Sequence, residues 1–547
     1  MRPVALLLAA AMPALLSAQA PAALHVDGGA SLGEFRPVFS YFGYDEPNYT
    51  YMQYGPKLVC ELARLSRSPV YIRVHHLLCT GDGAAALKWG STNAYTEDAA
   101  GHAVYDWTIV DRIFDTYMQA GARPFVEIGF MPEALSIRPQ PYTRNWPAPD
   151  DGQGWSYPPK DYVRWGELVR QWVLHSIQRY GRGEVETWYW EVWNEPDIGY
   201  WKGTAEEYDR LYDYAAAAVK SALPRARIGG PATTSPHNPK AADYLRQFLA
   251  HCATQHTPLD FITYHAKGQP QMVDNHVRMG LAREIEDVDA GMRVIAEFPA
   301  FVKLPIVLSE ADPEGCAACS ARSNPQNAYR NGPLYPAYTA AALGAMLQLA
   351  DRHHANFVGM LTWAFEFEHQ PYFAGFRTLA TNGIDKPVLN IFRMLGMMAG
   401  GQRVRVESAG AVALDELIAS GVRGQPHIDA IAVRSAHEIA TLVWNYHDDD
   451  VPAPPAAVNL TVTGIPAAAG RVLVRHYRID EEHSNAYTAW RRMGSPEQPA
   501  AEQYARLEAA GQLELLRSPE WVSAQDGKLS VNFTLPRQGV SLIEAAW

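Results

Sequence analysis

Glu195 follows a short aromatic stretch of the chain, and a carboxyl group at the end of such a stretch could act as an acid or a base. Residues 188–193 are tryptophan, tyrosine, tryptophan, glutamate, valine and tryptophan, a run that is typical of a buried strand. Pro196 ends such a strand because it has no N–H group, which leaves Glu195 at the strand's mouth against Trp193. An apolar wall raises the pKa of a carboxyl group, and cleavage of a glycosidic bond requires an acid that keeps its proton near neutral pH. A glutamate that only pairs with an arginine would fit the same pattern.

A second glutamate, Glu310, ends another strand-like run at residues 305–310 and is followed by Asp312 and Pro313. Two carboxyl groups that face each other across one opening are the minimum machinery of a glycosidase. One protonates the leaving oxygen, and the other attacks the anomeric carbon or activates water. Either glutamate alone says little about function, but the pair at the ends of two buried strands indicates a glycosidase.

The elements that must position these glutamates alternate regularly along the chain. Short apolar runs that read as strands are separated by amphipathic runs that read as helices, such as the helix expected between Asp106 and Gly121. The expected strands are residues 38–42, 70–75, 124–130, 188–193, 226–230, 261–265, 305–310 and 357–363. Eight strand–helix units in sequence predict an α/β fold, a (β/α)8 TIM barrel with its active site at the carboxyl ends of the strands.

The alternation of short strands with long helices stops after about residue 400. From residue 428 onward, short alternating strands are separated by proline, glycine and acidic turns, which predicts a β-sandwich. We therefore expect a catalytic barrel over residues 38–398 and a C-terminal β-sandwich domain over residues 399–547. Residues 21–37 form an outlying strand segment that could belong to the sandwich.

Residues 1–20 have the pattern of a cleavable secretory signal peptide. Arg2 precedes an apolar run at residues 4–16, and the following residues 17–20, Ser-Ala-Gln-Ala, fit the small-x-small rule of a cleavage site. The run is too short to span a bilayer, and no later segment has the length of a membrane helix. We therefore expect an exported protein, periplasmic or secreted, with no membrane partner.

Composition bears on the other partners and on cofactors. Lys and Arg number 47 against 59 Asp and Glu, and no basic cluster stands out, so nucleic acid is not an expected partner. The chain shows neither a metal-ligand cluster nor a glycine-rich phosphate loop, so we expect no metal and no other cofactor. Cys316 and Cys319 form a lone CxxC, for which a local disulfide is the expected state in an exported protein. The sequence does not fix the oligomeric state.

Several short motifs carry a family resemblance. They are residues 73–78, 193–197, 265–268, 310–313 and 373–379, and in the tail residues 479–487 and 490–494. With Asn194, Glu195 and Pro196 on the fourth strand and Glu310 on the seventh, the chain resembles the clan of retaining barrel glycosidases. More narrowly, these motifs resemble glycoside hydrolase family 39, which contains the β-xylosidases and α-L-iduronidases.

The resemblance implies roles for the matching residues. Glu195 would be the acid/base and Glu310 the nucleophile of a double displacement that retains the anomeric configuration. Asn194 would hydrogen-bond the 2-hydroxyl of the sugar in the transition state. The other implied residues are His75 for a ring hydroxyl, Arg73 to orient the nucleophile, Tyr264 and His265 along the nucleophile's side, Trp363 as the floor, and Lys267 and Arg377. Purely structural readings of Arg73, Tyr264 and Trp363 stay open.

Two of these residues bear on the substrate. Lys267 resembles the lysine with which iduronidases hold a uronate carboxylate, and Arg377 also matches their pattern, but Trp363 and Ala364 stand in place of the iduronidase aspartate on strand eight. With the exported, bacterial-style signal, the expected substrate is a β-D-xyloside at the non-reducing end of a xylo-oligosaccharide. An α-L-arabinosidase and an iduronidase-like uronide hydrolase are the alternatives. A non-catalytic carbohydrate-binding protein would lack at least one of the two carboxylates, and both are present.

Overall fold

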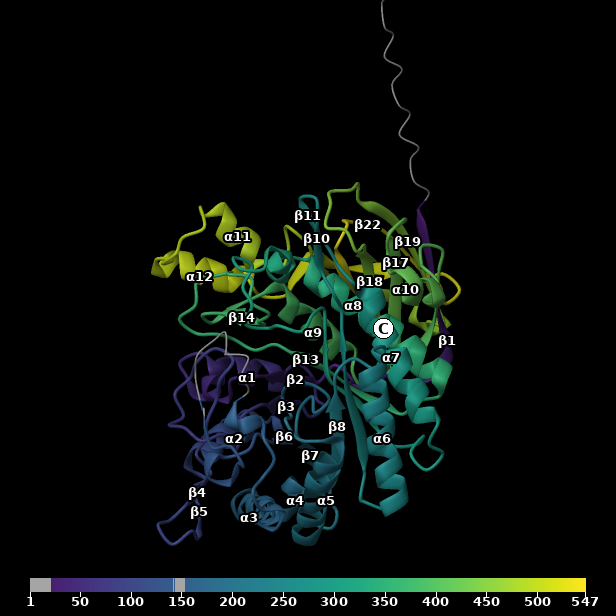
Figure 1. Ribbon diagram of the computed structural model, residues 1–547. Helices are drawn as coiled ribbons and strands as arrows, with labels where there is room; N and C mark the ends of the chain where they lie inside the picture. The colour runs from purple at the N-terminus through teal and green to yellow at the C-terminus, as the bar shows by residue number, and fades with distance from the viewer. Residues whose placement is uncertain (1–20, 141, 143–152) are drawn as a thin grey trace, which may run out of the picture.

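Eight parallel strands close into a barrel, as the alternating pattern predicts (Figure 1). The structure is a computed structural model that describes residues 21–140, 142 and 153–547, so the predicted signal peptide lies outside the described residues. The order around the barrel is β2 (Tyr41–Tyr44), β3 (Tyr71–Val74), β6 (Arg123–Ile128), β7 (Tyr189–Val192), β8 (Arg227–Thr233), β9 (Phe261–Lys267), β12 (Ile306–Asp312) and β13 (Phe357–Trp363). Each strand pairs in parallel with its neighbours, which places all their carboxyl ends at one end of the barrel.

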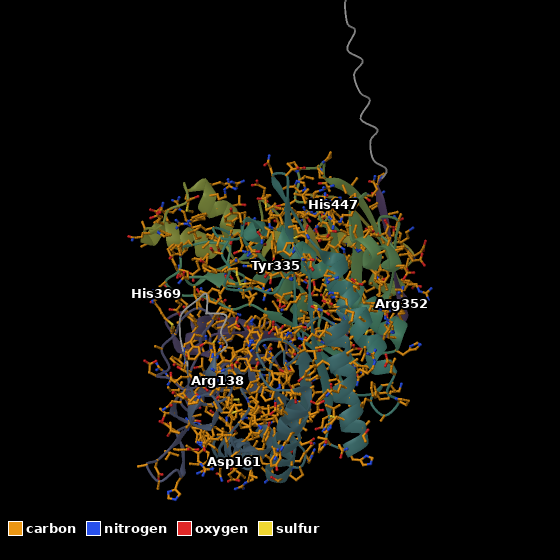
Figure 2. All side chains as sticks on the ribbon, in the orientation of Figure 1. Arg138, Asp161, Tyr335, Arg352, His369 and His447 are labelled. Carbon is orange, nitrogen blue, oxygen red and sulfur yellow. A yellow bond between two sulfur atoms is a disulfide. The ribbon has the colours of Figure 1, made fainter. Side chains whose placement is uncertain are left out.

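The barrel's helices follow its strands along the chain. They are α1 (Gly55–Ala63), α2 (Thr108–Ala120), α3 (Tyr162–Tyr180), α4 (Arg182–Val185), α5 (Ala205–Ala222), α6 (Pro239–Gln255), α7 (Leu281–Ala296), α8 (Leu334–His353) and α9 (Pro387–Met398). Local capping sets where two of them begin. Thr204 and Glu207 form a capping box at α5, and Asp161, at the bottom of Figure 2, accepts hydrogen bonds from the first N–H groups of α3.

Nine of the described strands outside the barrel form a second sheet above it in Figure 1. Its order is β21 (Glu514–Ser523), β20 (Arg471–Ile479), β23 (Val540–Ala546), β18 (Glu438–Tyr446), β17 (His427–Arg434), β16 (Gln402–Ser408), β1 (Ala22–Glu34), β19 (Ala456–Thr463) and β22 (Leu529–Leu535). Although β20 and β22 lie near opposite edges, the rings of His476 and Phe533 are 4.9 Å apart, and Arg478 donates to the Thr534 carbonyl at 2.9 Å. The sheet therefore folds back on itself, and the predicted barrel followed by a β-sandwich is confirmed.

Three helices interrupt the sandwich region, where the sequence predicts strands and turns. They are α10 (Leu414–Ser420), α11 (Ala486–Arg492) and α12 (Ala501–Ala510). α12 contacts the barrel, since Lys57 of α1 lies 2.9 Å from Glu508, and Tyr504 donates to the Asn382 carbonyl. The remaining short elements are strands β4 (Tyr95–Glu97), β5 (Ala103–Tyr105), β10 (Gln271–Val273), β11 (His276–Arg278), β14 (Ala380–Thr381) and β15 (Ile384–Asp385), and 3-10 helices η1 (Pro47–Tyr51), η2 (Glu133–Leu135), η3 (Gly154–Ser156), η4 (Pro325–Asn331) and η5 (Ala467–Ala469).

The lone CxxC forms the predicted local disulfide, Cys316–Cys319, in the loop after β12. Arg330 holds this loop by donating to the carbonyl oxygens of Cys316 at 2.6 Å and Cys319 at 2.7 Å. The bridge thus closes a turn next to the strand that carries Glu310. Among the described helices, none combines the length and apolarity that crossing a bilayer would need.

Candidate active site

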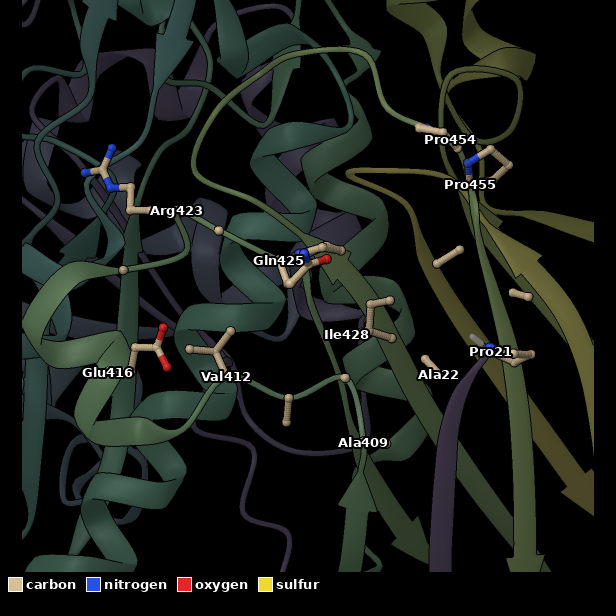
Figure 3. A pocket seen from close by; sticks show the side chains of 17 residues that line it. Pro21, Ala22, Ala409, Val412, Glu416, Arg423, Gln425, Ile428, Pro454 and Pro455 are labelled. Carbon is tan, nitrogen blue, oxygen red and sulfur yellow. The ribbon is translucent and has the colours of Figure 1, made fainter. Parts of the chain in front are cut away.

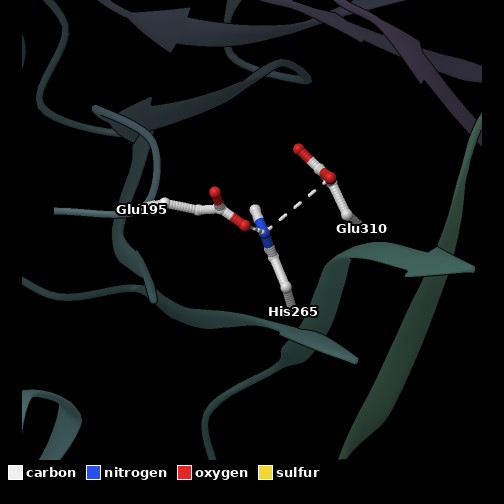
Figure 4. Close-up of side chains that lie close together, drawn as sticks. All are labelled: Glu195, His265 and Glu310. Atoms are coloured by element: carbon white, nitrogen blue, oxygen red, sulfur yellow. Dashed lines mark hydrogen bonds and ion pairs between the residues drawn. The ribbon is translucent and has the colours of Figure 1, made fainter. Parts of the chain in front are cut away.

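Glu195 and Glu310 face each other at the carboxyl end of the barrel, with His265 between them (Figure 4). Glu195 follows β7, His265 lies in β9 and Glu310 lies in β12. His265 Nδ1 lies 2.9 Å from Glu195 Oε1 and 3.9 Å from Glu310 Oε2. One atom from each of the three side chains lies within 4.8 Å of the other two. The carboxyl groups predicted on two separate strands therefore belong to one site.

The backbone after β7 turns sharply to present these side chains. Trp193 has a φ of 71° and Glu195 a φ of 44°, both in the left-handed region that non-glycine residues rarely adopt. Hydrogen bonds to the neighbouring strands fix the turn, since Trp193 N–H donates to the Ile128 carbonyl and Glu195 N–H to the Ala232 carbonyl. Such backbone strain persists where the surrounding structure enforces it, and it concentrates at functional sites.

Positive charge surrounds Glu310. Lys267 Nζ lies 2.7 Å from its Oε2 and Arg73 Nη1 lies 3.3 Å from its Oε1. The imidazole of His75 also lies near, with its Nε2 3.6 Å from Oε1. Burial alone would raise the pKa of Glu310, but the cations beside it, Lys267 first and also Arg73, hold it well below its ordinary value. Glu310 is therefore an ionised carboxylate near neutral pH, as a nucleophile must be.

Arg73 joins the two strands that carry the catalytic pair. Besides Glu310, its guanidinium contacts Asn194 Oδ1 at 2.9 Å, Glu191 at 2.5 Å and Glu127 at 3.0 Å. Burial tends to lower the pKa of Arg73, but these carboxylates raise it, so it stays charged. One buried cation thus fixes Asn194 beside Glu310.

Lys267 lies between two carboxylates. Its ammonium group is 2.7 Å from Glu310 Oε2 and 2.6 Å from Asp312 Oδ2. Burial tends to lower the pKa of Lys267, but Asp312 and Glu310 raise it above its ordinary value. The lysine is therefore charged, and its charge is already balanced inside the protein.

His75 and Trp363 form a wall beside Glu310. Their ring centroids lie 4.3 Å apart, and His75 Nδ1 lies 2.6 Å from Glu127 Oε2. Burial and the nearby Arg73 lower the pKa of His75 well below its ordinary value, so its imidazole is neutral. Trp363 donates its indole N–H to Asp45 at 3.1 Å.

The structure places two predicted site residues outside the pocket. Tyr264 donates its hydroxyl to the Val288 carbonyl of α7, and its ring lies against the α7 backbone at Gly291. The prediction that Tyr264 lines the nucleophile's side is therefore wrong, because alternation along β9 turns His265 inward and Tyr264 outward. Arg377 lies behind Asp312, fully buried, and donates to Glu314 and to the Trp363 carbonyl. The prediction that Arg377 contacts the substrate is wrong for a different reason, since its guanidinium is fully buried and lies against Asp312, Glu314 and the Trp363 carbonyl.

Three residues beside the pocket are absent from the sequence prediction. Asp45 follows β2, Lys88 lies in the loop after β3, and Tyr200 lies between β7 and α5. Asp45 had a usable signal, because it is an acidic residue at the end of a predicted strand, as Glu195 is. Lys88 and Tyr200 lie in loops without periodicity, where the sequence carries no such signal.

By distance alone, Glu195, His265 and Glu310 could also surround a cation. Lys267 and Arg73 already supply positive charge within 3.3 Å of Glu310. The absence of a metal cofactor stays a prediction.

A cavity of about 770 Å³ lies elsewhere, against the sandwich (Figure 3). Prolines, alanines and glycines make up much of its lining, and its ionisable side chains are Glu416 and Arg423. This lining contains neither a pair of carboxylates nor an aromatic face, so the chemistry belongs to the barrel.

A closed barrel with two glutamates facing each other at its carboxyl end defines a glycoside hydrolase. Comparison with known proteins agrees, because residues 61–518 match the family model described as Glycosyl hydrolases family 39. The chain belongs to this family.

The similar proteins include beta-xylosidases and alpha-L-iduronidases. The chain is 29% identical over 457 residues to a beta-xylosidase of Geobacillus stearothermophilus, which covers 80% of each chain. It is 28% identical over 380 residues to the alpha-L-iduronidase of Homo sapiens, covering 63% of this chain and 54% of that protein. Among solved structures, a monomeric beta-xylosidase from Caulobacter crescentus CB15 aligns with a TM-score of 0.75 at 24% identity, covering 96% of this chain and 99% of that one.

Proposed function

We propose that this glycoside hydrolase removes β-D-xylosyl residues from the non-reducing ends of xylo-oligosaccharides with retention of anomeric configuration. Glu195 acts as acid/base and Glu310 as nucleophile. We also propose that it acts after export, on the basis of its N-terminal signal pattern.

The spacing of the two glutamates supports retention. Retaining enzymes hold their carboxyl groups about 5–5.5 Å apart, whereas inverting enzymes leave about 6.5–9.5 Å for a water molecule. One oxygen of Glu195 lies within 4.8 Å of one oxygen of Glu310. This single observation carries the retaining mechanism and the roles of the two glutamates, because Glu310 is close enough to attack a carbon whose leaving oxygen Glu195 protonates.

The charge balance of the pocket supports a neutral sugar. The cations of the pocket already contact carboxylates of the protein: Arg73 contacts Glu191, Lys88 contacts Asp45, and Lys267 contacts Asp312. A uronate carboxylate would have to compete with these internal partners and would add negative charge beside Glu310. A β-xyloside has no such group.

Two measurements test the proposal. Among nitrophenyl glycosides of β-D-xylose, α-L-arabinose and α-L-iduronate, the β-xyloside should have the highest kcat/KM. Proton NMR during the first minutes should show β-xylose as the initial product, because two inversions at the anomeric carbon retain its configuration. Initial release of α-xylose would exclude the double displacement, and a preference for the iduronide would favour the uronide alternative.

Lys267 should set the acidic limit of activity. Since Lys267 helps hold the pKa of Glu310 below its ordinary value, removing its charge raises that pKa. In Lys267→Met, the acidic limb of kcat/KM against pH should therefore move to higher pH, because Glu310 must be ionised to attack. Lys267→Arg keeps the charge and is the matched control. An unchanged acidic limb in the methionine variant would contradict this role.

A further inference from the structure

A polar pair lies across His75 from the nucleophile, and the chemistry described above does not use it. It consists of Asp45, directly after β2, and Lys88, between β3 and β4. We propose that Lys88 and Asp45 bind a free ring hydroxyl of the terminal sugar, remote from the cleaved bond, and thereby restrict the enzyme to chain ends. This assignment rests on the proposed glycosidase function and names the contact that makes it exo-acting.

One side chain connects Asp45 to the nucleophile. His75 Nε2 lies 3.6 Å from Asp45 Oδ1 and 3.6 Å from Glu310 Oε1. Trp363 contacts the same histidine ring and donates to the other oxygen of Asp45. Asp45 and Glu310 thus share one wall of the pocket. A sugar with its anomeric carbon between the catalytic glutamates turns its remote hydroxyls along this wall, toward Asp45.

Lys88 is held firmly in the loop after β3. Its ammonium group lies 2.6 Å from Asp45 Oδ1, and its side chain is 13% exposed while that of Asp45 is 2% exposed. Its φ of 55° is left-handed, and its backbone N–H donates to Glu46 at 2.7 Å. The loop also packs closely on η1, because a Cβ at Gly90 would lie 2.3 Å from Pro47. A non-glycine residue kept in this conformation by its surroundings is a recurring feature of functional sites.

Tyr200 lies beside the histidine that separates the two pairs, since its ring centroid is 6.2 Å from that of His75. Lys88 tends to lower the pKa of the Tyr200 hydroxyl, whereas burial and three carboxylates raise it, with a net rise. Those carboxylates are Asp45, Glu195 and Glu310. The distance from Asp45 to Glu310 is bridged by the one ring of His75, whose Nε2 lies 3.6 Å from each, so a single sugar ring spans the two pairs.

The chemistry of the pair matches a sugar hydroxyl. A hydroxyl group both donates and accepts a hydrogen bond, an ammonium group only donates, and a carboxylate only accepts. Lys88 and Asp45 offer these two functions 2.6 Å apart. A hydroxyl bound there donates to Asp45 and accepts from Lys88, and charged partners make such bonds stronger than neutral ones.

This contact also explains why internal sugars would be rejected. A sugar linked to another unit through that oxygen has lost its hydroxyl proton and cannot donate to Asp45. It would also bring a bulky group against a carboxylate that is only 2% exposed. Only a terminal sugar with the free hydroxyl satisfies the pair.

Deoxy substrates combined with Lys88→Met test the contact. The kcat/KM of the wild type should fall roughly 10- to 100-fold on the 4-deoxy analogue of nitrophenyl β-xyloside, because the 4-hydroxyl carries the next unit of a 1,4-linked chain and must be the one that the pair binds. Lys88→Met should lose a similar factor on the parent substrate but little more on that analogue, because substrate and variant remove the same bond. Lys160→Met, which removes a surface lysine paired with Glu97, is the control and should behave as the wild type.

The assignment would be overturned if the losses from Lys88→Met and from the 4-deoxy substitution multiplied as independent effects. Asp45→Asn should repeat the pattern and provides a second variant. If neither variant folds, the wild type decides, since equal activity on the parent and the 4-deoxy analogue, or cleavage of a xylobioside capped at its terminal 4-hydroxyl, overturns the assignment. If the glycoside panel reveals another preferred sugar, the deoxy series is made on that sugar. A chain that cleaves no glycoside overturns the proposed function itself.

Discussion

Glu310→Gln should lose activity on every glycoside, with kcat/KM falling on the order of 10⁵-fold or more, because no glycosyl-enzyme can form without the attacking carboxylate. The loss should be the same for good and poor leaving groups, since the missing step is bond formation at the anomeric carbon. Glutamine fills the same space, so Lys267 and Arg73 keep a neighbour of similar size although they lose its charge. Steady-state kinetics with nitrophenyl and natural xylosides measure the effect.

Two comparisons make this result specific. Glu297→Gln changes a half-exposed glutamate that pairs with Arg246 on the surface, and it should leave kcat/KM unchanged. Glu310→Gly leaves room for azide on the nucleophile's face, so added azide should give a glycosyl azide of inverted configuration and no retained product. A Glu310→Gln enzyme with more than about one hundredth of wild-type activity would contradict the assignment of the nucleophile.

The barrel is predictable because each of its strands carries its own signal. β7 and β12 are buried on both faces and read as short apolar runs, and the helices between the barrel strands carry visible caps such as Thr204 and Glu207. Once the strands are counted, the position of Glu195 and Glu310 at one end follows from the parallel topology. The active site is therefore predictable wherever a residue lies directly at a strand end.

The wrong or missing predictions concern residues whose contacts depend on the direction of a side chain or on packing between distant segments. Tyr264 and His265 are adjacent in β9, and alternation prevents both from facing the pocket, a rule that could have been applied to the sequence. The position of Lys88 depends on a loop that packs on residues 46 and 47, far away in sequence, so no local pattern reveals it. Similarly, α12 was not expected among the strands of the sandwich, and its contact with Lys57 depends on the docking of the two domains.

Glu195→Gln should behave differently from Glu310→Gln, because it removes only proton donation and the later activation of water. A nitrophenolate leaving group barely needs a proton, so glycosylation of Glu310 should survive in this variant. Deglycosylation should be slow, because water then has no base. Nitrophenyl β-xyloside should therefore give a burst of nitrophenolate followed by a slow steady state. Xylobiose, whose leaving group needs protonation, should be cleaved roughly 10²- to 10⁴-fold more slowly than by the wild type.

Azide distinguishes the roles of the two glutamates most sharply. It needs no general base, so it should restore the turnover of Glu195→Gln on nitrophenyl β-xyloside and yield a β-xylosyl azide, with configuration retained through attack on the glycosyl-enzyme. His265, 2.9 Å from Glu195, stays in the variant, so the steady-state rate without azide also measures whether this imidazole can activate water in place of the lost carboxylate. Stopped-flow absorbance measures the burst, and NMR assigns the azide product. If the burst appeared in Glu310→Gln, or if azide gave a retained product there, the acid/base and nucleophile would have to be exchanged.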